Sequence, residues 1–136
     1  MKIISFVFAL VFALASHSYC NESAPPIQIK FEVPKGWKMV DSTTYILQDF
    51  NKTINYWKKE LSSGHLPWRL QPANVAAACL WDFGISDGSI IDDFADRLAI
   101  IEDGKIYSLK TDQQTFTVRI KTEDKTPIAY KLEIKK

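Results

Sequence analysis

Alternating hydrophobic and polar residues predict strands in two parts of the chain. Residues 27–33 show the period of two that is typical of a strand with one face in water, and residues 37–40 can continue the sheet after a turn. The C-terminal third opens with a short apolar run at 98–101, and Asp103-Gly104 then predicts a hairpin. The alternating apolar positions that follow are Phe116, Val118, Ile120, Ile128, Tyr130, Leu132 and Ile134. Because the connections are short and polar, we expect an antiparallel meander.

A change to spacings of three and four residues predicts a helix over residues 43–62. Its apolar stripe comprises Leu47, Phe50, Ile54, Trp57 and Leu61. Residues 41–44 offer N-cap side chains, and Gly64 followed by Pro67 marks the end of the helix.

Two more helices are predicted before the meander. Pro72 suits the first turn of a helix that stops at Gly84, and Ser89 with Asp92 three residues later resembles a capping box for a short helix that ends near Ala95. The predicted fold class is therefore α+β, with N-terminal helices packed on a C-terminal antiparallel β-meander. A cone-like curl of the sheet is one form that this arrangement can take.

The first residues have the pattern of an export signal. The apolar run 3–15 is shorter than the roughly 20 apolar residues that span a bilayer. Small residues allow cleavage after Ala15, Ser18 or Cys20, and we favour Cys20 because it leaves the apolar run several residues upstream. The alternatives are a membrane anchor that stays attached and a lipoprotein, for which Tyr19 is too bulky a neighbour of the lipidated cysteine.

The expected organisation is a signal peptide at residues 1–20 and a single α+β domain at residues 21–136. We expect the product to be soluble, periplasmic or secreted, with no integral membrane segment after cleavage. Cleavage removes Lys2, so the 17 basic residues become 16 against 16 acidic ones and the formal charge is zero. Because nucleic-acid binding needs a basic face, the partner is expected to be a protein or a small molecule and not a nucleic acid.

The chain has two cysteines, and the cleavage site decides what they can do. Cleavage after Cys20 leaves Cys79 alone, and its apolar neighbours predict a small core residue. Cleavage further upstream would keep both thiols and allow a Cys20–Cys79 disulfide in an oxidising compartment.

Catalytic chemistry is sparse in this sequence. His65 lies between two predicted helices, and with an acid such as Asp82 it could act in general acid–base catalysis. A lone histidine in a loop is more often a surface residue, so His65 and Asp82 are only weak catalytic candidates.

The aspartates at 82, 87, 92, 93 and 96 suggest a calcium loop, but the spacing does not fit. Gly84 takes the third position of the pattern, Asp87 replaces its glycine and Asp93 replaces its final glutamate. We therefore assign these acids to turns and helix caps, and we expect no metal site and no cofactor.

Aromatic residues provide the candidate binding site. Trp68 and Arg69 lie in a connection stiffened by two prolines, and Trp81 lies roughly opposite the apolar face of the second helix. A rigid aromatic side chain beside arginine is typical of an interface anchor, so we predict Trp68, Arg69 and Trp81 as binding residues. The alternative is that Trp68 fills the core while Arg69 pairs with a carboxylate.

The run Pro67-Trp68-Arg69-Leu70-Gln71-Pro72, between two helices of a small exported chain that ends in a meander, resembles a run found in some uncharacterised bacterial secreted or envelope proteins. The resemblance covers the middle and C-terminal parts of the chain and implies no activity. The order of helices before a meander is also similar to cystatin-like and nuclear-transport-factor-like folds, in which a sheet curls around a helix.

These observations favour a non-catalytic binding or accessory protein of the cell envelope. One alternative is a small hydrolase or lyase that uses His65 in a cone-shaped pocket. Another is an inhibitor or immunity protein, which would show no activity without its protein partner.

Cleavage can be tested directly by mass spectrometry after expression in a host that exports the protein. The expected mass corresponds to a chain that begins at Asn21. Retention of the full-length chain in the cytosol would contradict the export prediction, and a mass that includes Cys20 would keep the disulfide alternative open.

Overall fold

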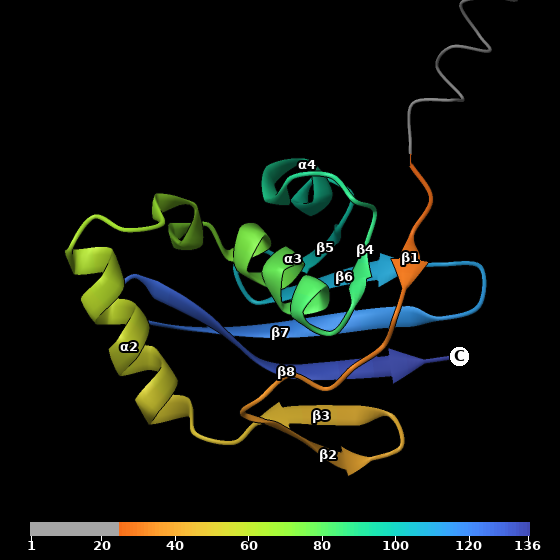
Figure 1. Cartoon of the computed structure of the whole chain (residues 1–136), viewed down its shortest axis with the longest axis horizontal. Coiled ribbons are helices and arrows are strands. Elements are labelled where there is room, and N and C mark those ends of the chain that lie inside the picture. Colours follow the sequence, from red (N-terminus) through yellow and green to blue (C-terminus); the bar gives the residue numbers. More distant parts are fainter. Residues whose placement is uncertain (1–24) are drawn as a thin grey trace, which may run out of the picture.

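The computed structural model describes residues 25–136, so the predicted signal peptide and Cys20 lie outside the described residues. Six antiparallel strands form the main sheet, in the spatial order β2-β3-β8-β7-β6-β5 (Figure 1). Their bounds are β2 (Trp37–Asp41), β3 (Thr44–Leu47), β5 (Ala99–Glu102), β6 (Ile106–Lys110), β7 (Thr115–Glu123) and β8 (Thr126–Lys135). A separate two-stranded sheet pairs β1 (Gln28–Ile29) with β4 (Ile85–Ser86).

The helices lie against one face and one end of the main sheet (Figure 1). They are α2 (Phe50–Ser62), the 3-10 helix η1 (Pro67–Leu70), α3 (Pro72–Asp82) and α4 (Ile91–Ala95). Helix α3 packs on β7 and β8 and contacts α4, while α2 contacts β8 at the end of the sheet. Among the described residues, no helix has the length and apolar character needed to cross a membrane. The predicted α+β class is confirmed.

The C-terminal meander is also confirmed, with one difference in β8. Phe116, Val118 and Ile120 alternate as buried residues along β7, as the sequence pattern predicts. The register shifts next to Ile120, which pairs with Ala129, so Tyr130 is left out of the pairing. The regular alternation predicted through Tyr130 is therefore wrong, because a bulge there brings Ala129 into the core.

The predicted start of the first helix is wrong. Residues 44–47 form β3, which pairs with β2 on one side and β8 on the other, and the helix begins only at Phe50. Asp49 is the N-cap, and its side chain accepts a hydrogen bond from Lys52 N at 3.0 Å. Leu47 fits both a helical and a strand period, and its pairing with Trp37 of β2 places it in the strand. From Phe50 onward the stripe is as predicted, with Ile54 at its buried centre.

The predicted N-terminal strand does not join the main sheet. Its residues instead line up against the end of α3, where Lys30 N donates to Gly84 O at 2.8 Å and Glu32 N donates to Phe83 O at 3.1 Å. The segment is thereby attached along one edge to the turn that follows α3.

The capping box predicted for the third helix is likewise wrong. Ile90 is the N-cap residue and makes no side-chain cap hydrogen bond. Ser89 instead donates from its backbone N and its Oγ to Asp87, which also accepts from Arg97 Nη1 at 3.1 Å. Asp87 is a buried turn residue, in agreement with the structural assignment of the aspartates.

Phe83 joins the end of α3 to three segments that precede it in the sequence. Its side chain is fully buried, and the ring centroids of Phe31, Trp37 and Tyr45 lie 5.7, 5.0 and 5.6 Å from its own. The next residue, Gly84, has φ +82°, and a Cβ there would lie 1.9 Å from Lys30 O. Only glycine therefore allows the N-terminal segment to approach this turn so closely.

The β7–β8 turn uses two non-glycine residues in the left-handed region, Asp124 at φ 48° and Lys125 at φ 64°. This backbone suits a tight hairpin but is unfavourable for L-residues. Lys58 of α2 lies across from the turn, with its Nζ 2.9 Å from Asp124 Oδ2 and 3.7 Å from Glu123 Oε2. The turn is thus linked to α2.

The close approach at Gly84 predicts a large effect of a single methyl group. We expect Gly84→Ala to lower the free energy of unfolding by about 2 kcal/mol or more, because it adds a clash with Lys30 O to the left-handed backbone strain. Gly88→Ala is the matched control, since Gly88 has φ +78° with open space around the added Cβ. Urea denaturation of both variants measures the difference, and equal losses would contradict a steric role for Gly84.

Candidate functional site

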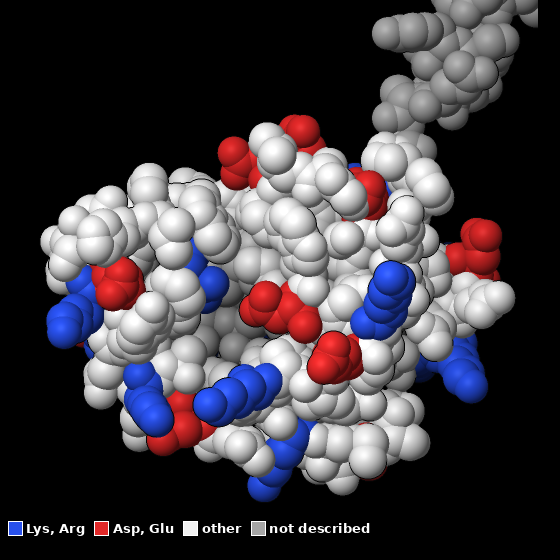
Figure 2. Space-filling model, viewed as in Figure 1, with Lys and Arg blue, Asp and Glu red and all other residues white. Residues whose placement is uncertain are grey.

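A narrow cleft lies between α2, α3 and β8. Its volume is about 100 Å³. Figure 2 shows the hollow between the α2 side and the α3 side of the molecule, with basic and acidic side chains at its edge. The lining residues come from six elements and are Trp37, Leu47, Thr53, Trp57, Arg69, Val75, Cys79, Asp82, Ile128 and Ala129. The cleft therefore combines an apolar wall with a cation, a carboxylate and a thiol.

Arg69 is held in place by aromatic stacking. Its guanidinium carbon lies 3.7 Å from the centroid of the Trp57 ring and 5.5 Å from that of Trp68. The local backbone is fixed by Pro67 in the first turn of η1, and Asn74 Nδ2 donates to Trp68 O at 3.2 Å. The stiff connection seen in the sequence thus positions one arginine against the Trp57 ring of α2, at the edge of the cleft.

Polar pairing of Arg69 within the protein is incomplete. Its Nε is buried and has no hydrogen-bond acceptor among residues 25–136, and none of the ion pairs in this part of the chain includes Arg69. Burial lowers the pKa of Arg69 to about 10, against the opposing effect of the Asp82 charge. The guanidinium remains a cation at neutral pH and can donate to an anionic group.

Asp82 and Cys79 line the cleft on the α3 side. Burial raises the pKa of Asp82, while the positive charge of Arg69 acts in the other direction. Burial also raises the pKa of the Cys79 thiol, so this group stays protonated and is a poor nucleophile. Cys79 is part of the main core, which confirms its prediction as a core residue, and the alternative pairing with Cys20 falls outside the described residues.

The structure brings some of the predicted site residues together. Arg69 and Asp82 share the cleft, and Trp68 lies beside Arg69. Trp81 is 43% exposed and is not among the lining residues, although it directly precedes Asp82 on α3. The alternative in which Arg69 pairs with a carboxylate is not what the structure shows, because the contact of Arg69 is with Trp57.

His65 is separate from this cleft. Its side chain is 64% exposed, and Nδ1 lies 2.9 Å from Glu60 Oε2. It does not line the cavity that Asp82 lines, so the two weak catalytic candidates do not form an acid–base pair. Among the described residues, there is also no group of three or more His, Cys, Asp or Glu side chains that could hold a metal ion.

Trp57 is a site residue that the sequence did not reveal. Its spacing places it in the apolar stripe of α2, and that placement is correct, since Trp57 is half-buried. Its stacking against Arg69 depends on the position of η1, which no local spacing in the sequence indicates. The only hint in the sequence is the high number of tryptophans, four in 136 residues.

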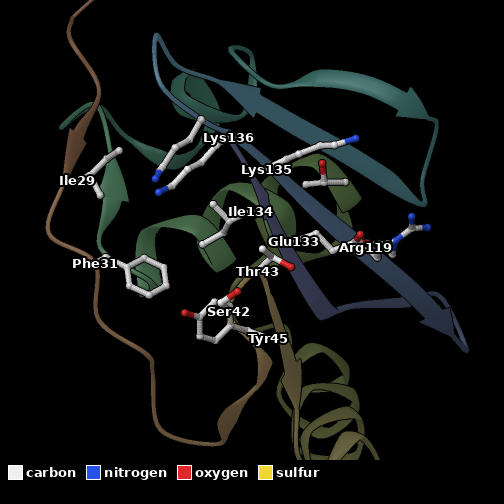
Figure 3. A pocket seen from close by; sticks show the side chains of 12 residues that line it. Ile29, Phe31, Ser42, Thr43, Tyr45, Arg119, Glu133, Ile134, Lys135 and Lys136 are labelled. Carbon is white, nitrogen blue, oxygen red and sulfur yellow. Dashed lines mark hydrogen bonds and ion pairs between the residues drawn. The ribbon is translucent and has the colours of Figure 1, made fainter.

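A second and larger depression lies at the other end of the main sheet (Figure 3). Its volume is about 1020 Å³, and it runs between the N-terminal segment, the β2–β3 turn and the end of β8. We call it the sheet-end groove. Its lining includes Ile29, Phe31, Ser42, Thr43, Tyr45, Gln114, Thr117, Arg119, Glu133, Ile134, Lys135 and Lys136.

Comparison of the chain with known protein families, with curated proteins and with solved structures found no match. The assignment of a function therefore rests on the chemistry of the described residues.

The raised pKa of Asp82 predicts a pH-dependent contribution to stability. The folded protein holds this proton more tightly than the unfolded chain, so the free energy of unfolding falls as pH rises from about 3.9 through the folded pKa. The Asp82→Asn variant has no carboxyl group at this position. Its free energy of unfolding relative to that of the wild type should therefore increase as the pH rises over this range. Urea denaturation between pH 3.5 and 7 measures the trend, with Asp112→Asn as a control for the loss of one surface charge. A difference that does not change with pH would contradict the desolvation of the Asp82 carboxyl in the cleft.

Proposed function

We propose that this chain is a non-catalytic binding or accessory protein of the cell envelope or extracellular space, and that Arg69 binds an acidic group of its partner. The observation that carries the proposal is a guanidinium stacked on Trp57 whose buried Nε has no acceptor in the described protein. Export of the chain is part of the proposal and rests on the sequence pattern of residues 1–20.

The stacking of Arg69 suits the recognition of a carboxylate. Trp57 fixes the plane of the guanidinium, and a planar fork can donate two parallel hydrogen bonds to one carboxylate group. A buried donor without an acceptor costs about 1–3 kcal/mol, so the Arg69 Nε lowers the stability of the fold, while the accessible part of the guanidinium is free to donate to an acidic group of a partner. Arg69 is therefore better explained by binding than by its contribution to the stability of the fold.

The size of the cleft favours a macromolecular partner. Pockets for whole small molecules usually have volumes of about 300–1,000 Å³. The cleft at Arg69 has only about 100 Å³, which admits one side-chain group. Exposed aromatic residues flank the elements that form it, namely Tyr56 beside Trp57 and Trp81 beside Asp82. We infer that a partner protein inserts one acidic side chain at Arg69 and contacts these aromatic residues around it.

A protein partner makes an inhibitor or immunity protein the second candidate function. Such a protein acts by tight binding and needs no catalytic group of its own. The hydrolase or lyase hypothesis gains no support from the geometry, because His65 pairs with Glu60 and the Cys79 thiol is protonated.

The proposal predicts that substitution of Arg69 weakens partner binding without lowering the stability of the fold. Immobilised protein should retain its partner from envelope extracts, and Arg69→Met should reduce this retention by about tenfold or more, as for an interface hot spot. Arg69→Lys keeps the charge but loses the fork, so an intermediate loss is expected. The melting temperature of Arg69→Met should remain unchanged or rise slightly, because the variant removes a half-buried charge.

Lys59→Met is the matched control, since Lys59 is an exposed cation on the neighbouring helix α2. It should retain the partner as the wild type does. A fall of several degrees in the melting temperature of Arg69→Met would show that Arg69 is a structural residue, and unchanged retention would exclude it from the binding site.

A further inference from the structure

Arg69 and Asp82 line the same cleft and carry opposite charges, yet they do not form an ion pair. None of the ion pairs within residues 25–136 joins the two side chains, and Arg69 Nε has no acceptor there. Stacking on Trp57 holds the guanidinium on the α2 side of the cleft, whereas Asp82 lies on the α3 side. The space between them is open to a ligand group.

The cleft is too small to keep an acidic ligand away from Asp82. Its volume of about 100 Å³ has room for one group of the size of a carboxylate. A group that accepts hydrogen bonds from Arg69 inside this space therefore also lies close to the Asp82 carboxyl. The ligand meets one cation and one acid of the protein at the same time.

Two carboxylates beside a single guanidinium cannot both stay ionised without a penalty. Like charges at short range disfavour each other, and such a pair relieves the repulsion by holding one proton between its two members. Desolvation already raises the pKa of Asp82 in the protein alone, and a bound anion acts in the same direction. A protonated Asp82 can then donate a hydrogen bond to the ligand from the side opposite Arg69.

No other group at the cleft changes its charge near neutral pH. The Cys79 thiol, one turn before Asp82 on α3, stays protonated because burial raises its pKa. Tyr56 of α2 has only a weak electrostatic effect on Arg69 and does not line the cleft. The remaining lining residues, from α2, α3, β2, β3 and β8, carry no charge and are Thr53, Trp57, Val75, Trp37, Leu47, Ile128 and Ala129.

We propose that Asp82 controls the affinity of Arg69 for its acidic ligand, because the Asp82 carboxyl takes up a proton from the solvent when the ligand binds. The inference rests on the proposed function, in which Arg69 binds an acidic group. Binding is tight at acidic pH, where Asp82 is protonated, and weakens as the pH rises and Asp82 becomes an anion. The partner is thus captured in acidic surroundings and released in alkaline ones.

The test uses formate, a carboxylate small enough for the cleft that remains ionised from pH 5 to pH 8. Titrations at these two pH values and constant ionic strength are followed by the NMR signals of Arg69 Nε–H and Trp57 Nε1–H. So small a ligand is expected to bind with a dissociation constant in roughly the millimolar range. We expect the affinity of the wild type to be about tenfold higher at pH 5 than at pH 8, as for one like-charge contact at a partly solvated site.

Three variants assign the pH dependence. Asp82→Asn stays neutral and keeps a donor, so it should bind formate equally at both pH values, with about the affinity of the wild type at pH 5. Asp93→Asn is the matched control, since Asp93 is exposed on α4 and does not line the cleft, and it should keep the tenfold difference. Arg69→Met should not bind formate at either pH.

The outcomes separate this inference from the proposed function. Equal affinities of the wild type at pH 5 and pH 8, or a tenfold difference that persists in Asp82→Asn, would overturn the role of Asp82 and leave the anion site at Arg69 intact. Weaker binding by Asp82→Asn at both pH values would also overturn it, because the carboxylate would then support the site. Absence of formate binding to the wild type at both pH values would overturn the anion site itself and this inference with it.

Discussion

The contact between the end of α3 and the N-terminal segment holds the structure together. Phe83 places one ring against aromatic side chains from three separate segments of the chain, and its carbonyl accepts the backbone N–H of Glu32. Gly84 makes the close approach possible. This one turn fixes the position of Phe31 in the wall of the sheet-end groove. It also ends the helix that supplies Cys79 and Asp82 to the Arg69 cleft, so both candidate sites depend on it.

The two sites use positive charge in different ways. At Arg69 the charge is half-buried, oriented by Trp57, and confined to a space that admits only one acidic group. Burial makes such an interaction directional and strong, but the protein bears a desolvation cost until the partner arrives. At the sheet-end groove Lys135 and Lys136 are exposed, and Ile29 and Phe31 provide apolar surface. The arrangement at Arg69 is suited to the recognition of a single acidic group.

Local sequence patterns were sufficient for most of the elements and for part of the site. The stripe from Phe50 to Leu61, the Pro72 helix and the meander follow from periodicity, proline positions and turn residues that act over a few positions. The same reasoning failed where distant segments compete for a residue. Leu47 belongs to a strand because it pairs with Trp37 of β2, and Ala129 enters the core because β8 carries a bulge. Arg69 was identified by its rigid setting, whereas its stacking on Trp57 depends on packing between two helices that no spacing encodes.

The ion pair between Lys58 and Asp124 connects the β7–β8 turn to the helix that carries Trp57. The pair lies at the surface, where added salt weakens such interactions over a Debye length of about 8 Å at physiological ionic strength. Because Lys58 follows Trp57 directly, any loosening of this tether acts on the support beneath Arg69. A change in ionic strength can therefore affect the cleft without any ion binding at the Arg69 guanidinium, because it alters the ion pair between α2 and the β7–β8 turn.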